Sequence, residues 1–101
     1  MKKHEILIVC AHTEILNTIL RLINSNESLH GTGANTLEQA ITTFTSSSCD
    51  LVLIGAGLSE TEEQELESII SRSRKKVPVV HHYGGGSGLL FTEIYGALGV
   101  K

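Results

Sequence analysis

The residues best suited to chemistry in this sequence are a cysteine and three histidines that lie where strands are expected to end. A thiolate combined with imidazole suits zinc or copper, and the candidate ligands are Cys10, His12 and His82. His81 comes directly before His82, and consecutive strand residues point to opposite faces, so only one of the two could enter a shared site. The spacing matches no known metal motif. We therefore favour histidines without a ligand, and we expect no metal and no cofactor.

A glycine-rich stretch after the last histidine is a candidate anion site. Glycines allow backbone N–H groups to approach a phosphate closely at a helix N-terminus. The candidate residues are Gly84, Gly85, Gly86, Ser87 and Gly88. A plain turn between a strand and a helix explains the same residues, and this simpler interpretation is favoured.

Four segments predict the strands of a parallel sheet that would position these residues. Residues 51–54 are four consecutive large aliphatics, which is typical of a central strand covered on both faces. Apolar runs at residues 5–9 and 77–80 predict its companions. Residues 29–34 contain two glycines and predict a short strand at the sheet edge.

Apolar residues at helical spacing predict a helix after each strand. The first helix follows Thr13 as its N-cap and stops at residues 24–26, and two pairs of capping residues open the next two helices: Thr36 with Gln39, and Ser59 with Glu62. Residues 89–98 predict a final helix, with a strand through 89–91 as the open alternative. The alternating order predicts a three-layer α/β/α sandwich of the flavodoxin type, with a four-stranded parallel sheet in the order 2-1-3-4.

Length and composition indicate one domain, residues 1–101. The chain has 101 residues, of which 41% are hydrophobic, and this suits a single core. Its net charge of −3 disfavours nucleic acid as a partner. The apolar run at residues 6–10 is too short for a signal sequence or a membrane span. We expect a cytoplasmic protein whose two cysteines, Cys10 and Cys49, lie at opposite edges of the sheet and do not pair.

The order of these segments resembles the receiver domain of two-component response regulators over nearly the whole chain. The similar segments are residues 5–9 with 14–17, 34–41, 50–54 and 77–80. The resemblance implies a flavodoxin-like fold and a place in signal transduction. At the family's phosphorylation site the chain departs from the pattern: the acidic pair falls on Cys10 and Ala11, the phosphoacceptor aspartate on Gly55, and the switch residue near Tyr83. The fifth strand with its lysine is also missing, since the sequence stops at Lys101.

These departures remove the chemistry that the resemblance would otherwise imply. Aspartyl phosphorylation needs a carboxylate nucleophile and a magnesium ion held by carboxylates. Neither is found at the matching positions. The sequence therefore predicts a pseudo-receiver that cannot be phosphorylated, is not an enzyme, and acts by binding a protein partner.

A second resemblance gives the alternative function. A cysteine at the end of the first of four parallel strands, followed by a closing helix, is similar to the lactose/cellobiose-type B component of the sugar phosphotransferase system. This resemblance implies a phosphocarrier with Cys10 as the nucleophile. The loop at residues 11–15 departs from the pattern, because its bulky residues and Glu14 suit a phosphate poorly.

The fourth strand suggests how the chain would assemble. Without a fifth strand, residues 77–81 form an open sheet edge with apolar side chains, which is a template for association. We expect a homodimer formed either by pairing of fourth strands or by packing of the final helices.

Overall fold

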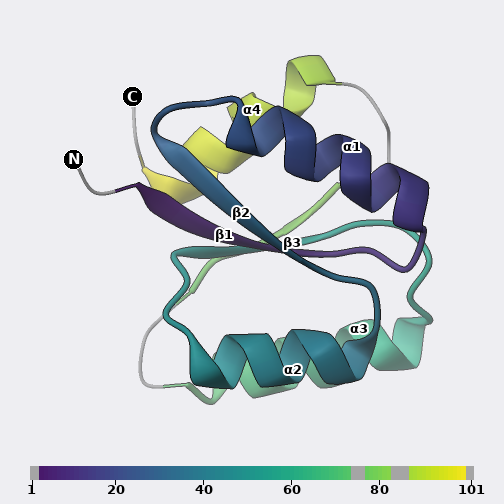
Figure 1. Ribbon diagram of the computed structural model, residues 1–101. Helices are drawn as coiled ribbons and strands as arrows, with labels where there is room; N and C mark the ends of the chain where they lie inside the picture. Colours follow the sequence, from purple (N-terminus) through teal and green to yellow (C-terminus); the bar gives the residue numbers. More distant parts are fainter. Residues whose placement is uncertain (1–2, 74–76, 83–86, 100–101) are drawn as a thin grey trace.

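The computed structural model describes residues 3–73, 77–82 and 87–99, and in them strands and helices alternate along the chain (Figure 1). The strands are β1 (His4–Val9), β2 (Leu29–Ala34), β3 (Leu51–Ile54) and β4 (Val79–His81). The helices are α1 (Thr13–Asn24), α2 (Leu37–Ser46), α3 (Glu60–Ser71) and α4 (Ser87–Leu98). No helix in these ranges is long and apolar enough to span a bilayer.

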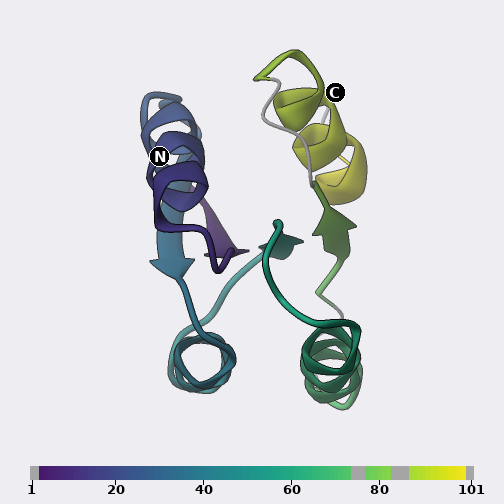
Figure 2. The ribbon, with the colours of Figure 1, turned by 90° about the vertical axis from the view of Figure 1, so that its right-hand side faces the viewer.

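The four strands form one parallel sheet in the order β2-β1-β3-β4, as the sequence predicted. Helices α1 and α4 cover one face and helices α2 and α3 cover the other, so the chain has three layers (Figure 2). All four residues of β3 are completely buried, which agrees with its four consecutive aliphatics. The predicted sandwich and strand order are confirmed.

Two glycines in β2 allow α1 to pack closely on the sheet. A Cβ atom on Gly31 would lie 2.9 Å from Cδ1 of Ile8 on β1 and 3.1 Å from Cγ2 of Ile23 on α1, and a Cβ atom on Gly33 would lie 2.8 Å from Cδ1 of Leu20 on α1. Real Cβ atoms do not approach so closely, because protein interiors are already packed to high density. The glycines that weaken the strand pattern in the sequence therefore let α1 lie close to the sheet without displacing neighbouring side chains.

The final segment is helical, and the alternative of a strand at residues 89–91 is wrong. Helix α4 packs against β3 and β4 on the face that it shares with α1. Its residues Leu90 and Ile94 are completely or almost completely buried there. Because α1 contacts β1 and β2, α4 covers the other half of this face.

The helix starts agree with the sequence in two cases out of three. Ser59 and Glu62 form the full capping box. The Thr36 hydroxyl accepts from the Gln39 N–H, whereas the Gln39 side chain accepts from the N–H of Asn35, one residue earlier than expected. Helix α1 differs. Thr13 is its first helical residue, and His12 is the N-cap without a side-chain cap bond, so the predicted cap was wrong by one position.

The fourth strand starts two residues later than predicted and ends one residue later. Val77 and Pro78 precede β4, and the carbonyl oxygen of Pro78 accepts from Val52 N–H at 3.0 Å. Proline has no N–H, so it can enter a ladder only as an acceptor. The strand begins at Val79, where both backbone groups are present.

Candidate functional site

Cys10 lies at the carboxyl edge of the sheet, where it is sealed from solvent. It follows β1 directly and has no exposed surface. Its thiol donates to the carbonyl oxygens of Ala56, at 3.3 Å, and His12, at 3.5 Å. Its N–H donates to the carbonyl oxygen of Ala34 at 3.0 Å. Cys10 therefore connects its own loop to the end of β2 and to the loop after β3, and its sulfur is held as a buried donor.

Two glycines fill the rest of this edge with backbone. Gly55 follows β3 and donates to the carbonyl oxygen of Val9 at 2.7 Å; a Cβ atom on it would lie 3.1 Å from both Cβ and Sγ of Cys10. Gly57 has φ +106°, and a Cβ atom there would lie 2.6 Å from Cβ of Ala11. The positions that match the receiver's acidic pair and phosphoacceptor thus carry no carboxylate, and their space is occupied. Tyr83 lies outside the described residues.

The candidate metal ligands are not brought together. Cys10 is sealed at the edge, His12 is exposed at the start of α1, and the His82 ring is engaged by Glu93. In the described part of the chain, the group of side chains close enough to share an ion is a different one: Glu63, Glu67 and His81. The structure therefore gives no support to a metal site formed by Cys10, His12 and His82.

The group formed by Glu63, Glu67 and His81 joins α3 to β4. Nε2 of His81 lies 3.7 Å from a carboxylate oxygen of Glu63 and 3.6 Å from one of Glu67. Glu63 and Glu67 are four residues apart on α3, and this spacing places both on one helix face. Sequence analysis missed the group because the third member comes from β4. Attraction between a histidine and two partly exposed glutamates explains it without a metal.

His82 points to the opposite face from His81, as the alternation of strand side chains predicts. It is 7% exposed, and its Nδ1 lies 2.7 Å from Oε1 of Glu93 on α4. Its N–H donates to the carbonyl oxygen of Ile54 at 2.9 Å, which fixes the backbone beside the sheet. The sequence drew attention to His82 but not to Glu93, because the pair forms only when α4 folds back over the sheet.

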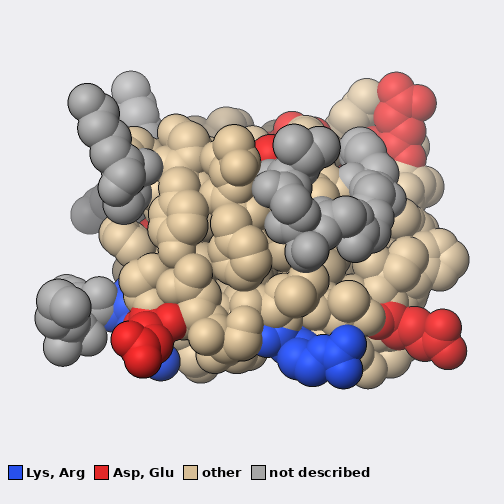
Figure 3. Space-filling model, turned by 90° about the horizontal axis from the view of Figure 1, so that it is seen from above, with Lys and Arg blue, Asp and Glu red and all other residues tan. Residues whose placement is uncertain are grey.

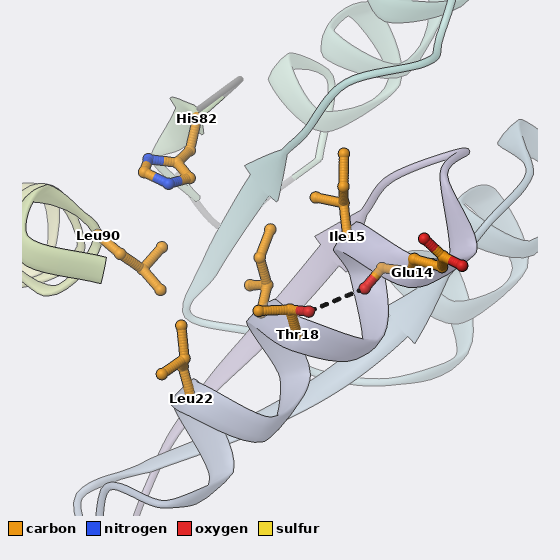
Figure 4. Close-up of a pocket in the computed structure, with 7 residues that line it drawn as sticks. Glu14, Ile15, Thr18, Leu22, His82 and Leu90 are labelled. Atoms are coloured by element: carbon orange, nitrogen blue, oxygen red, sulfur yellow. Dashed lines mark hydrogen bonds between the residues drawn. The ribbon is translucent and has the colours of Figure 1, made fainter. Parts of the chain in front are cut away.

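His82 lines a cavity of about 250 Å³ between α1 and α4, which we call the α1/α4 cavity (Figure 4). Most of its wall is apolar, and its lining residues are Glu14, Ile15, Thr18, Ile19, Leu22, His82 and Leu90. The hydroxyl of Thr18 donates to the carbonyl oxygen of Glu14 at 3.0 Å. The cavity therefore combines an aliphatic wall with a few polar atoms, which is typical of small-molecule sites.

Apolar side chains contribute to the face of the molecule that α1 and α4 form. Seen from the side of α1 and α4, most of the described Lys, Arg, Asp and Glu side chains in view lie toward the rim of the molecule (Figure 3). Partly buried apolar residues contribute to this face, among them Leu22, Phe91, Tyr95 and Leu98. Phe91 and Tyr95 stack with ring centroids 6.4 Å apart. This face suits an apolar ligand better than a polyanion.

The proposed anion site remains a prediction. Gly84, Gly85 and Gly86 lie outside the described residues, and Ser87 and Gly88 form the start of α4. The two cysteines behave as predicted, since both are free and buried.

The fold resembles two groups of solved structures. It superimposes on the signal receiver domain of an HD domain-containing protein from Pseudomonas fluorescens Pf-5, with TM-score 0.71, 20% identity, and coverage of 98% of this chain and 78% of that one. For a response regulator receiver protein from Pseudomonas putida the TM-score is 0.69, the identity 15%, and the coverage 99% and 83%. Both agree with the resemblance that the sequence suggested.

The lactose-specific IIB component domain of the phosphoenolpyruvate:carbohydrate phosphotransferase system from Streptococcus pneumoniae matches as well. Its TM-score is 0.65 and its identity 14%, and the match covers 97% of this chain and 93% of that domain. No protein-family model and no curated protein matches the sequence. At these identities the matches establish the flavodoxin-like fold, and function has to be argued from the residues.

Proposed function

We propose that this chain is a single receiver-like domain, residues 1–101, that works in cytoplasmic signalling by binding another protein and accepts no phosphoryl group. The observation that supports this most strongly is the carboxyl edge of the sheet. Cys10, Ala11 and Gly55 stand where the receiver family has carboxylates, and a Cβ atom on Gly55 would already be 3.1 Å from Cys10. An aspartyl phosphate needs both the missing nucleophile and the missing magnesium ligands.

A cysteine phosphocarrier is the competing function, and the match to the lactose-specific IIB domain favours it at the level of fold. The reactivity of a cysteine depends on access to its sulfur and on the thiolate form. Cys10 has no exposed surface, and its thiol donates to two carbonyl oxygens. The first turn of α1 also places the exposed residue Glu14 close by in sequence, where its negative charge would repel phosphate. The geometry at Cys10 therefore supports a structural thiol.

Incubation with phosphoryl donors tests both functions at once. We expect the intact mass of the protein to stay unchanged after incubation with acetyl phosphate and Mg²⁺, or with a phosphohistidine carrier protein. A phosphorylatable receiver and a lactose-type B component, treated in parallel, control for the donors. A hydroxylamine-sensitive adduct would contradict the proposal by revealing an acyl phosphate. An adduct that disappears in Cys10→Ala would contradict it in favour of the cysteine phosphocarrier.

The outer side of β4 is the proposed place for a protein partner, here a second copy of the chain. The C=O of Pro78 and the N–H of His82 form hydrogen bonds with β3. Alternate residues of a strand direct their N–H and C=O groups to opposite sides, so these groups of Val79 point away from β3. Such an open edge is a template for another strand. A symmetric pair of β4 strands would cover the same edge in both copies.

Light scattering should therefore give the mass of a dimer at micromolar concentration. Val79→Pro removes the outward N–H donor, and we expect it to shift the mass to that of one chain. Val79→Ile keeps the donor and should remain dimeric. Circular dichroism checks that both variants are folded. A monomeric wild-type protein would contradict the dimer, and a folded, dimeric Val79→Pro variant would exclude strand pairing and assign the contact to α4.

A further inference from the structure

We propose that the α1/α4 cavity binds a small neutral molecule with an apolar body and one hydroxyl or N–H donor, and that Nε2 of His82 accepts this donor. The proposal concerns a different surface from the β4 edge and does not depend on phosphoryl chemistry. It rests on the burial and orientation of His82, on the shape of the cavity, and on the kind of polar atoms that line it.

His82 is a buried polar residue with one ring nitrogen left to interact. The side chain is 8% exposed, and its Nδ1 lies 2.7 Å from Oε1 of Glu93. An ionised carboxylate can only accept, so Nδ1 carries the hydrogen and, in the neutral ring, Nε2 is the acceptor. A carboxylate that orients one imidazole nitrogen in this way presents the other nitrogen at a fixed angle.

Nε2 faces the cavity. No protein group within the described ranges forms a hydrogen bond with it. Every fully buried side-chain nitrogen or oxygen in those ranges has a partner, so Nε2 is not fully buried and is reached from the side that His82 lines. Figure 4 shows the His82 ring next to Leu90 of α4, with Ile15 of α1 on the opposite side of the cavity. A ligand that carries a donor would give this nitrogen the hydrogen-bond partner that no described protein group supplies.

The size and polarity of the cavity limit the ligand. Its volume is about 250 Å³, and an apolar cavity of about 150 Å³ is enough to hold benzene. One substituted ring or a short branched chain therefore fits. The Thr18 hydroxyl gives its hydrogen to Glu14, so the oxygen of Thr18 presents lone pairs as a second acceptor.

Charge disfavours an anionic ligand. Among the described residues no lysine or arginine lines the cavity, whereas Glu14 is one of its lining residues and Glu93 holds the His82 ring. A carboxylate or phosphate ligand would meet acceptors and nearby negative charge without a compensating cation. A donor such as a phenolic hydroxyl matches Nε2, and the aliphatic side chains Ile19 and Leu22 match an apolar ring.

Phenol is the probe, with anisole and benzoate as matched compounds. Anisole keeps the ring but replaces the donor hydrogen with a methyl group, and benzoate carries a negative charge. We expect phenol to shift the NMR amide signals of Ile15, Thr18 and Ile19 with a Kd on the order of 1 mM, as is typical of a fragment of this size. Anisole and benzoate should bind about tenfold more weakly, because each lacks the donor that Nε2 accepts. The titration is run at about pH 8.5 to keep imidazole rings neutral.

Two substitutions on α1 locate the binding. Thr18→Phe places a ring in the cavity and should weaken phenol binding at least about tenfold. Asn17→Phe adds the same side chain to the neighbouring exposed residue, outside the cavity lining, and should leave binding unchanged. His82→Phe keeps a planar ring but removes the acceptor, so it should reduce the affinity for phenol to that for anisole while anisole itself is unaffected.

Each outcome decides for or against the proposal. Absence of saturable shifts with phenol would overturn it, as would equal affinity for phenol and anisole in the wild-type protein. Equal shifts in the wild-type protein and Thr18→Phe would show non-specific association and would also overturn it. If His82→Phe does not fold, the comparison of phenol with anisole and the two α1 variants still test the donor and the location.

Discussion

Replacing Gly57 with alanine should lower the free energy of unfolding by about 3 kcal/mol, which is a large part of the stability of a small domain. Gly57 has φ +106°, a conformation that residues with a Cβ atom rarely adopt. The added Cβ atom would also lie 2.6 Å from Cβ of Ala11 and 3.3 Å from its N and Cα atoms. The N–H of Ala11 donates a hydrogen bond to the carbonyl oxygen of Ala56, so the loop after β3 cannot move away from Ala11 to relieve the overlap. Backbone strain and steric overlap therefore act together.

Gly96 provides the matched control. It lies within α4, and a Cβ atom on it would meet no atom within 4 Å. Alanine is the better helix former, so Gly96→Ala should raise the free energy of unfolding by about 0.5 to 1 kcal/mol. Urea denaturation of the wild-type protein, Gly57→Ala and Gly96→Ala measures the change in the free energy of unfolding for each substitution. Similar changes for the two substitutions would show that the conformation of Gly57 does not determine the effect.

Most of the fold could be predicted because its strands are marked by local sequence. The four aliphatics at 51–54 can be satisfied only where both faces are covered, and all four are indeed completely buried. Two glycines made β2 the weakest strand in the sequence, yet the structure needs them for the approach of α1. The boundaries of β4 were less predictable, because Pro78 can accept from β3 but cannot donate.

The candidate site was predicted less completely, because its pairs join distant parts of the chain. The sequence alone placed three residues at the carboxyl ends of their strands: Cys10, Ala11 and Gly55. The structure adds that Gly55 packs directly against Cys10, and that Gly57 packs against Ala11. The pairing of His82 with Glu93 depends on the face to which α4 returns. The right-handed crossover rule predicts the sheet face only for a helix that connects two parallel strands. Among the described residues α4 is followed by no strand, so the local sequence does not predict which face of the sheet it covers.

Replacing Gly55 with aspartate should not create a site that accepts phosphate, and Gly55→Asp should lower the free energy of unfolding by about 3 to 5 kcal/mol. Gly55 is buried, and its Cβ atom would be 3.1 Å from both Cβ and Sγ of Cys10 and 3.7 Å from the carbonyl oxygen of His82. A carboxylate added here would therefore be crowded, would lie near another oxygen, and would have no cation among its neighbours at Cys10 and Ala11. Removing water from an unpaired charge is costly.

Two further variants separate crowding from charge at this position. Gly55→Ala adds only the Cβ atom and should cost about 1 to 2 kcal/mol, because Cys10 has to shift by a few tenths of an ångström. Gly55→Asn has nearly the shape of aspartate without its charge, so the difference between the Asn and Asp variants measures the charge alone. Chemical denaturation gives the free energies, and acetyl phosphate with Mg²⁺ tests acceptance of phosphate. A Gly55→Asp protein with wild-type stability that becomes phosphorylated would show that this edge of the sheet still has room for the receiver's chemistry. We expect the opposite, because Gly55 packs directly on the buried thiol of Cys10 and leaves little space for an added carboxylate.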